Sequence, residues 1–363
     1  MREGWTYKKL GEVCNTSSGG TPSKSHVEYY EGGTIPWLRS GEVAQGLIYG
    51  TELCITDLGM KNSSAKLFPV DTVVIAMYGA TVGQVGILKK EMTTNQAICG
   101  VFPNKILNPM FLLYCLKAKK PFFIKDAIGG AQPNISQNLI KNTTVPIPSL
   151  SEQQSIVVEL DKINELISLK KAQLSDLDSL AQSIFYDMFG DPIENEKRWE
   201  VKLWSDVLTI INGKNQKSVE CVGGEFPIYG SGGIMSYANN WLCPEECIII
   251  GRKGNINKPI FVRTKFWNVD TAFGLDAKRD ILSPTYLYYF CIDYDFERHN
   301  KAVTIPSLTK ADLLKISIPL PPLPLQQDFA KRIELIEQQK TQISSTIKDL
   351  ETLLASRMQY WFD

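Results

Sequence analysis

The sequence predicts an α+β fold: two similar globular domains of mixed α and β structure, separated by two long antiparallel coiled-coil helices, in a pseudo-twofold molecule. Three observations predict this fold class. The sequence repeats itself at a nearly constant offset, each repeat ends in heptad-spaced apolar residues, and the remainder alternates short apolar runs with Gly, Pro and Asn. At 363 residues, the chain is long enough for two separate cores.

The internal duplication is clearest where each globular part meets its helix. Val145-Pro146-Ile147-Pro148 corresponds to Ile318-Pro319-Leu320-Pro321 at an offset of 173 residues, and Gln153-Gln154 corresponds to Gln326-Gln327 at the same offset, without a gap. Chance similarity would not keep one register across a proline motif and a glutamine pair. The chain therefore contains one structural unit twice.

The globular parts contain predicted strands and short helices. Thr72-Val73-Val74-Ile75-Ala76 and Cys247-Ile248-Ile249-Ile250 are apolar, β-branched runs bounded by turn residues, which indicates buried strands. The segments that follow Asn108-Pro109 and Ser283-Pro284 are predicted to be short helices, because Asn or Ser before Pro suits a helix start.

Heptad spacing predicts the two long helices. Ser151 is predicted to be the N-cap of the first, with Gln154 completing a capping box. From Ile156 to Met188, and again from position 329 to 354, apolar residues recur at alternating steps of four and three. This spacing is typical of a coiled-coil seam.

Some residues of these helices depart from the seam. Lys170 and Lys340 interrupt it, and we interpret them as water-exposed or snorkelling side chains rather than as register-setting residues. Val157, Leu166 and Leu169 are apolar but lie off the seam. They indicate either a partner surface or a thicker intramolecular core, and the sequence leaves both interpretations open.

Connectivity predicts the direction of the helices and the domain boundaries. The second helix can bury its seam against the first only by running back, so the pair is antiparallel. The predicted parts are a domain at 1–150, a helix at 151–189, a linker and second domain at 190–323, and a helix at 324–363. About 33 residues per helix give a rod of about 50 Å, the length of about 15 base pairs.

Charge is distributed unevenly although the net charge is zero. Residues 151–188 carry seven acids and three bases and residues 325–363 carry six and five, which leaves 26 acids and 31 bases elsewhere. The globular parts are therefore mildly basic, as expected if they meet phosphates. Eight scattered cysteines and two histidines favour reduced thiols and no metal site. No run suggests a signal peptide or a membrane helix.

Several motifs of this chain resemble those of a known protein family. Ser18-Gly19-Gly20-Thr21-Pro22-Ser23, followed by Gly33-Thr34-Ile35-Pro36-Trp37, resembles the opening of a target-recognition domain of type I restriction–modification specificity subunits. Val145-Pro146-Ile147-Pro148 leading into Glu152-Gln153-Gln154 is similar to that family's passage into its helix, and Met188-Phe189-Gly190-Asp191-Pro192 resembles the end of its central helix. The resemblance covers essentially the whole chain.

The resemblance implies a function in sequence recognition. Each recognition domain would read one half of a split, asymmetric double-stranded DNA site through the major groove, and the helices would set the spacer and dock two methyltransferase (modification) subunits. Those subunits would methylate adenine with S-adenosylmethionine, and two restriction subunits would use ATP and Mg to translocate and cut unmethylated DNA. The chain itself would bind no cofactor, have no catalytic activity, avoid membranes and work in a prokaryotic cytoplasm. A non-catalytic structural adaptor with two protein-binding end domains is the alternative.

The second repeat departs from the family pattern at one motif. It lacks the Gly-Gly-Thr-Pro-Ser run and has Asn212-Gly213-Lys214-Asn215-Gln216-Lys217 instead. The two halves are therefore expected to read different bases, which suits an asymmetric site.

Candidate DNA-binding residues are polar or basic residues in loops, because Arg and Lys match guanine, Asn and Gln match adenine, and cations or free backbone amides in Gly-rich loops reach phosphates. Each of them is open to a second interpretation as a turn former. In the first repeat they are Lys24, Arg39, Tyr78, Thr81, Gln132, Asn134 and Ser136. In the second they are Lys214, Lys217, Tyr229, Ser231, Arg252, Lys253, Asn255, Thr304 and Ser307.

The sequence contains no convincing catalytic motif. Asn108-Pro109-Met110-Phe111 lacks the second proline of an amino-methyltransferase loop. Asp276-Ala277-Lys278 resembles part of a nuclease site but has no upstream acidic partner. Two histidines also leave little room for acid–base chemistry. The sequence therefore favours recognition over a standalone nuclease or methyltransferase.

Overall fold

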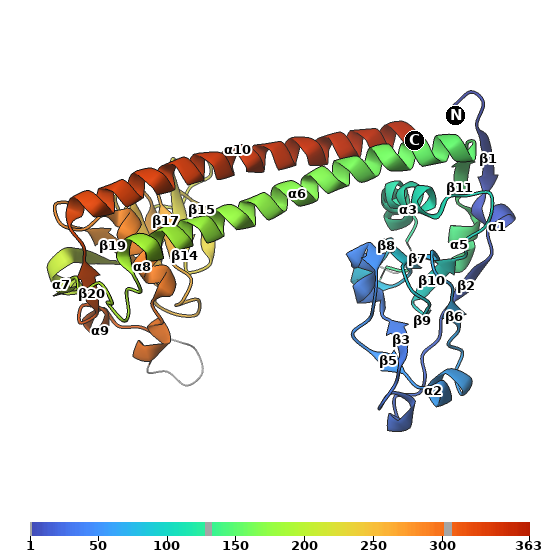
Figure 1. The fold of residues 1–363 in the computed structure, drawn as a ribbon, viewed down its shortest axis with the longest axis horizontal. Coiled ribbons are helices and arrows are strands. Elements are labelled where there is room, and N and C mark those ends of the chain that lie inside the picture. The colour runs from blue at the N-terminus through green and yellow to red at the C-terminus, as the bar shows by residue number, and fades with distance from the viewer. Residues whose placement is uncertain (1, 128–132, 301–306) are drawn as a thin grey trace. The chain divides into compact units, whose positions relative to one another are not determined.

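The computed structural model describes residues 2–127, 133–300 and 307–363 (Figure 1). The chain folds into two compact units. Unit 1 comprises Met1–Leu169 together with Ile347–Asp363, and unit 2 comprises Lys170–Thr346. Each unit therefore contains part of both long helices.

Unit 1 is built on two sheets. In the larger sheet the strands follow the order β2 (Thr16–Ser18), β10 (Ile98–Val101), β7 (Val73–Ala76), β8 (Val85–Leu88) and β4 (Leu47–Ile48). In the smaller sheet the order is β5 (Cys54–Ile55), β3 (Ile35–Leu38), β9 (Met92–Thr94) and β6 (Leu67–Phe68). Every residue of β7 is buried, which confirms the strand predicted at this position.

Short helices and one further strand pair complete the globular part of unit 1. Strands β1 (Thr6–Lys9) and β11 (Thr144–Ile147) pair antiparallel. The short helices are α1 (Leu10–Val13), α2 (Asp57–Lys61), α3 (Pro109–Ala118), α4 (Lys120–Lys125), α5 (Gln137–Asn142) and the 3-10 helices η1 (Val27–Tyr29), η2 (Ser40–Gln45) and η3 (Gly79–Thr81). Asn108 caps α3, since its side chain accepts hydrogen bonds from the amides of Met110 and Phe111, and this confirms the predicted helix start.

Unit 2 repeats this plan. Its larger sheet follows the order β13 (Leu208–Asn212), β19 (Ala272–Ala277), β16 (Cys247–Gly251) and β17 (Ile260–Val262). Its smaller sheet follows the order β15 (Gly233–Ala238), β14 (Phe226–Gly230) and β18 (Trp267–Asn268), and β12 (Glu200–Leu203) pairs with β20 (Ser317–Leu320). The helices are α7 (Trp204–Val207), α8 (Pro284–Asp293), α9 (Lys310–Leu313) and the 3-10 helix η4 (Phe296–His299).

The strand orders of the two units correspond. The order β2-β10-β7-β8 matches β13-β19-β16-β17, and β5-β3-β9 matches β15-β14-β18. In both small sheets the central strand has a parallel neighbour, β9 in unit 1 and β18 in unit 2. The units differ in how that central strand continues: η2 and β4 separate β3 from β5, whereas a tight turn joins β14 directly to β15. The duplication predicted from sequence is therefore a duplication of fold.

The long helices are α6 (Leu150–Phe189) and α10 (Leu323–Phe362). In unit 1, Glu159 of α6 forms an ion pair with Arg357 of α10. In unit 2, Asp178 of α6 forms an ion pair with Lys340 of α10, at 2.7 Å. The residue number rises along α6 while that of its partner falls along α10, so the helices run antiparallel, as predicted. The α+β fold class with two similar domains and two long helices is confirmed.

The predicted N-cap of α6 was wrong by two residues. The helix begins at Leu150, and the hydroxyl of Ser149 accepts a hydrogen bond from the amide of Glu152 at 3.2 Å. Ser151 lies inside the helix, where its carbonyl accepts a hydrogen bond from Ser155. Both serines satisfy the capping pattern in the sequence, but Ser149 also has an acidic residue three positions later, which suits the first turn.

Each globular part is attached to its helix by a fully buried glutamine. In unit 1, the side chain of Gln153 accepts a hydrogen bond from the amide of Asn108 at 2.7 Å and donates to the carbonyls of Ile106 and Pro148, both at 3.0 Å. In unit 2, the side chain of Gln326 accepts from the amide of Ser283 at 2.8 Å and donates to the carbonyls of Ile281 and Pro321, at 3.2 and 2.7 Å. The first glutamine of each Gln-Gln motif thus joins the start of a long helix to the start of α3 or α8.

Candidate nucleic-acid interface

Equivalent loops lie at the end of the central strand of the larger sheet in each unit. In unit 1, Tyr78 after β7 forms a β-bridge with Asn134. In unit 2, Lys253 after β16 forms a β-bridge with Ser307. In both units, the residue that follows the second bridge partner donates its amide to the carbonyl of the residue that precedes the first partner, at 2.9 Å. The structure therefore brings four of the predicted DNA-binding residues together, in two equivalent pairs with different side chains.

Other predicted residues of unit 1 are engaged by their own backbone. The Thr81 hydroxyl donates to the carbonyl of Tyr78 at 3.2 Å. The Ser136 hydroxyl caps α5 by accepting from the amide of Leu139 at 3.1 Å. These contacts hold the loop in shape, while the ring of Tyr78 is exposed. Gln132 of unit 1 and Thr304 of unit 2 lie outside the described residues.

An open hollow of about 480 Å³ lies beside the small sheet of unit 1. Its lining includes Thr21, Lys24, Tyr30, Trp37, Arg39, Leu53, Asn95 and Gln96. The Gly19-Gly20 run directly precedes Thr21 of this lining. A Cβ on Gly19 would lie 2.1 Å from the carbonyl oxygen of Thr94, and one on Gly20 would lie 2.3 Å from the amide nitrogen of Ala65. Only glycine lets this loop approach the strands so closely.

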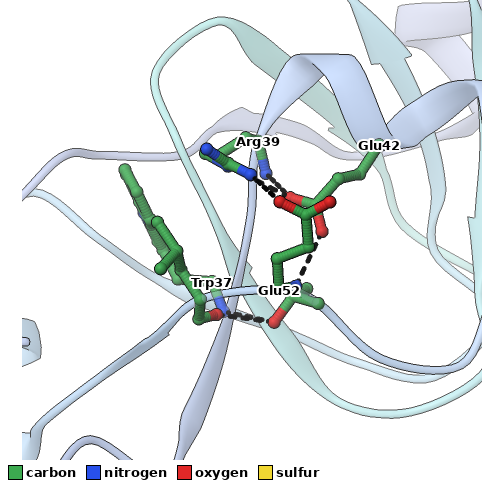
Figure 2. Close-up of polar contacts among 6 residues, drawn as sticks. Trp37, Arg39, Glu42 and Glu52 are labelled. Atoms are coloured by element: carbon green, nitrogen blue, oxygen red, sulfur yellow. Dashed lines mark hydrogen bonds and ion pairs between the residues drawn. The ribbon is translucent and has the colours of Figure 1, made fainter. Parts of the chain in front are cut away.

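Arg39 occupies this hollow as one member of a charged cluster (Figure 2). Its Nε lies 3.5 Å from the carboxylate of Glu42, its amide donates to the same carboxylate at 3.0 Å, and its Nη2 pairs with Glu52. Glu42 is buried and also accepts from the amide of Glu52 at 2.9 Å, whereas the Glu52 side chain is exposed. Glu42 therefore fixes Arg39 in place, and a guanine contact by Nη2 of Arg39 would have to displace the exposed Glu52 carboxylate.

Sequence reasoning missed three polar residues of the hollow. Thr21 donates a hydrogen bond to Oε1 of Gln96, a contact that does not use the two Nε2 protons of that side chain. Asn95 lies beside them and accepts from the amide of Ala97 at 3.1 Å. The sequence does mark these positions: Thr21 belongs to the Gly-Gly-Thr-Pro-Ser motif, and the segment of Asn95 and Gln96 aligns with Val269-Asp270-Thr271-Ala272 of the second repeat.

Unit 2 gathers several predicted residues around two turns. A Cβ placed on Gly232 would lie 3.6 Å from Nδ2 of Asn255, and one on Gly254 would lie 4.0 Å from Oγ of Ser231. The turn that joins β14 to β15 therefore touches the turn at residues 252–255. Ser231, Arg252, Lys253, Asn255 and Ser307 share this surface. Arg252 is exposed, and its guanidinium lies 5.9 Å from the ring centre of Phe273.

The remaining predicted residues of unit 2 lie elsewhere. The backbone of Lys214 is tied to the end of β18, with its amide donating to Asn268 and its carbonyl accepting from the Trp267 indole, both at 3.0 Å. The exposed Lys217 follows in a turn held by Asn215. Tyr229 is half-buried and packs edge-on against Phe266 at 5.5 Å, and burial raises the pKa of its hydroxyl. Its ring belongs to the packing of the small sheet.

The described residues offer no metal chemistry. Within 2–127, 133–300 and 307–363, no three His, Cys, Asp or Glu side chains are grouped so as to hold an ion. All eight cysteines are free thiols, and burial raises the pKa of Cys99 and Cys115 to about 12. In the same part of the chain, no helix has the length and apolarity needed to cross a membrane.

A model of the type I restriction modification DNA specificity domain matches residues 2–178 and matches again residues 196–352. The chain belongs to this family. It is a specificity subunit of a type I restriction–modification system, with two recognition domains.

One relative of this specificity subunit matches it over most of both chains, and another matches less than half of each. The specificity subunit of the type I restriction enzyme MjaIX from Methanocaldococcus jannaschii is 27% identical over 375 residues, which cover 91% of this chain and 86% of that one. The EcoR124I/EcoR124II specificity subunit from Escherichia coli is 29% identical over 165 residues, which cover 44% and 41% of the two chains.

Solved structures support the fold of the specificity subunit. The S subunit of a type I system from M. genitalium superimposes with a TM-score of 0.60 at 16% identity, covering 99% of this chain and 96% of that one. A chain from a study of assembly and conformational transition of a type I system gives a TM-score of 0.65 at 19% identity, covering 100% and 98%.

Proposed function

We propose that this specificity subunit reads a bipartite, asymmetric site in double-stranded DNA, unit 1 reading one half and unit 2 the other. The two long helices set the spacer and dock two methyltransferase subunits, which methylate adenine with S-adenosylmethionine. Two restriction subunits add ATP- and Mg-dependent translocation and cleavage of unmethylated DNA. The chain itself recognises the DNA and catalyses no reaction, and it acts in the cytoplasm, where the chromosome lies.

One observation carries this proposal: the same backbone framework presents different side chains in the two units. The bridged pair is Tyr78 and Asn134 in unit 1 but Lys253 and Ser307 in unit 2. A fold used to bind two copies of one partner would keep its contact residues alike. A fold used to read two different base sequences must change them, because each base pair presents its own pattern of donors and acceptors in the major groove.

Charge supports DNA as the partner of unit 2. Residues 251–269 carry five bases, namely Arg252, Lys253, Lys258, Arg263 and Lys265, and no acid. This segment includes the turn that touches Ser231. A cationic segment of this kind neutralises phosphates and supplies affinity that falls as salt rises.

The proposal is tested by methylation. The chain is co-expressed with its methyltransferase subunits in a host free of adenine methylation, and genomic DNA is sequenced by a single-molecule method that detects methyladenine. We expect one motif of two defined blocks around a fixed spacer. A stable complex that leaves the genome unmethylated and binds DNA without salt dependence would favour the adaptor alternative and overturn the proposal.

Replacing Lys253 by alanine is expected to weaken DNA binding at every sequence and to reduce the slope of log K against log salt by about 0.9, the effect of one lost phosphate contact. The backbone bridge to Ser307 does not depend on the lysine side chain, so the turn keeps its shape. Fluorescence anisotropy at several salt concentrations measures the slope.

Arg279→Ala is the matched control for this measurement. It also removes one positive charge from unit 2, but the Arg279 guanidinium is held by the carbonyl of Glu245 at 2.6 Å and by the carboxylate of Glu246. Its slope is expected to equal that of the wild type. An unchanged slope in Lys253→Ala would show that this lysine does not contact phosphate.

A further inference from the structure

Unit 2 exposes an unusual set of apolar side chains on and after one strand. Ile234 and Met235 of β15 are 54% and 60% exposed, although they are consecutive residues of a strand. Tyr237 of the same strand and Trp241 just after it are also exposed. Clustered apolar groups on a protein surface mark sites of interaction, because exposing them to water is unfavourable.

A β-bulge explains why two neighbours are both exposed. In the β14–β15 hairpin, Ile228 pairs with Ser236 and Tyr229 pairs with Ile234, so Met235 is an extra residue without a partner on β14. A bulge changes the direction of the side chains around it. The third strand, β18, pairs with Ile228 and Tyr229 on the other side of β14, so β15 is the free edge of this hairpin ribbon, and past Tyr229 only the pair Gly230–Gly233 leads to the turn.

Charge around the hairpin fits a nucleic acid. Residues 226–244, which contain the hairpin and Trp241, carry no charged side chain, and residues 251–269 carry five bases and no acid. The Lys265 ammonium lies 4.7 Å from the ring centre of Trp241. The turn of the hairpin touches the exposed turn at 252–255, at Gly254 and Asn255. An uncharged ribbon flanked by cations can approach bases while its neighbours bind phosphates.

The size and chemistry of the ribbon match one feature of DNA. The major groove admits a two-stranded β-ribbon, and the one apolar group that base pairs present there is the C5 methyl of thymine. We propose that the β14–β15 hairpin enters the major groove and that Ile234 and Met235 read a thymine methyl group. This inference rests on the proposed function and names the base edge that unit 2 recognises.

The corresponding strands of unit 1 present different chemistry. There β3 and β5 adjoin the hollow that contains Arg39, Gln96 and Asn95, which are hydrogen-bonding groups. The tight turn of unit 2 replaces the segment with η2 and β4 that follows β3 in unit 1. The apolar ribbon is thus a local specialisation of unit 2, and it accounts for a difference in reading between the two halves.

The test uses the complete complex of this chain with its methyltransferase subunits. The probe is a synthetic duplex that carries the motif found by sequencing, with each thymine in turn replaced by deoxyuridine, which lacks only the C5 methyl. Binding is measured by competition with the unmodified duplex. At one thymine of one half-site, we expect about four-fold weaker binding, the effect of losing one buried methyl group.

The double variant Ile234→Ala, Met235→Ala is expected to bind the thymine and deoxyuridine duplexes equally. Both side chains are mostly exposed, so melting temperature should stay within a few degrees of the wild type. Ile292→Ala is the control, since Ile292 is also exposed, at 41%, but lies on α8. It should retain the four-fold preference.

The outcomes separate this inference from the proposed function. A defined methylation motif whose binding is insensitive to every thymine methyl would overturn the inference and leave the function standing. A preference that persists in the double variant would also overturn it, because another part of the protein would then contact the methyl group. Absence of any defined motif would overturn both.

Discussion

Replacing Gln326 by leucine is expected to destabilise unit 2 by about 4 kcal/mol. The substitution leaves the amide of Ser283 and the carbonyls of Ile281 and Pro321 buried without their partner, and each unsatisfied group costs about 1–3 kcal/mol. Leucine fills a similar volume, so the loss comes from hydrogen bonds rather than from a cavity. Hydrogen–deuterium exchange should show faster exchange at Ser283 and along the start of α10.

The neighbouring glutamine provides a matched control. Gln327 follows Gln326 in the same helix turn but is exposed. Gln327→Leu should change stability by less than about 0.5 kcal/mol. Equal effects of the two substitutions would contradict the assignment of the three hydrogen bonds. In unit 1, Gln153→Leu should reproduce the loss, because its side chain makes the same three contacts.

Phe185→Ala is the second substitution with a large expected effect, a loss of about 4 kcal/mol in the free energy of unfolding of unit 2. Phe185 is fully buried, and its ring lies 5.2–5.7 Å from the ring centres of Phe189, Tyr286, Tyr289 and Phe329. Truncation would leave a cavity among these rings and remove their contacts with Phe185. The urea midpoint, followed by tryptophan fluorescence, measures the loss.

A leucine on the same helix serves as control for Phe185. Leu180 of α6 is 48% exposed, so Leu180→Ala removes an apolar side chain without opening a cavity. Its expected effect is below about 1 kcal/mol. If Phe185→Ala were no more damaging than Leu180→Ala, the aromatic cluster would not be what attaches the end of α6 to unit 2.

The elements that sequence predicted well are those specified by local patterns. The apolar runs that became β7 and β16 bury all of their residues, and Asn108-Pro109 begins α3. Heptad spacing located α6 and α10 because it is repeated over many turns. The N-cap of α6 failed because Ser149 and Ser151 offer the same local chemistry, and only the start of the helix distinguishes them.

The off-seam residues show where local patterns stop being sufficient. Val157 is buried in the core of unit 1, whereas Leu166 and Leu169, further along the same helix, are exposed. In the sequence all three look alike, because each is an apolar residue that lies off the heptad seam. What separates them is whether α3 and its sheet cover that stretch of α6, which depends on tertiary contacts.

The candidate interface was predicted in part for the same reason. The structure pairs Tyr78 with Asn134 and Lys253 with Ser307, as polar loop residues that sequence had singled out. It also pairs Arg39 with Glu42 and Glu52, and adds Gln96 to the hollow. Glu42 follows Arg39 by three residues, but the positions of Glu52 and Gln96 cannot be read from the sequence, because other segments of the chain bring them there. Contact of all these residues with DNA stays a prediction.

The division of the long helices between the units has a consequence for biosynthesis. Unit 2 is one continuous stretch, Lys170–Thr346, whereas unit 1 needs Ile347–Asp363 to complete its core, where Phe362 packs on Phe111 at 5.3 Å. At about 5–20 residues per second, the ribosome delivers that segment about 10–40 s after Leu169. Unit 1 is therefore the first to be synthesised and the last to be completed. Until its C-terminal segment is made, the nascent N-terminal half exposes an apolar surface that chaperones can bind.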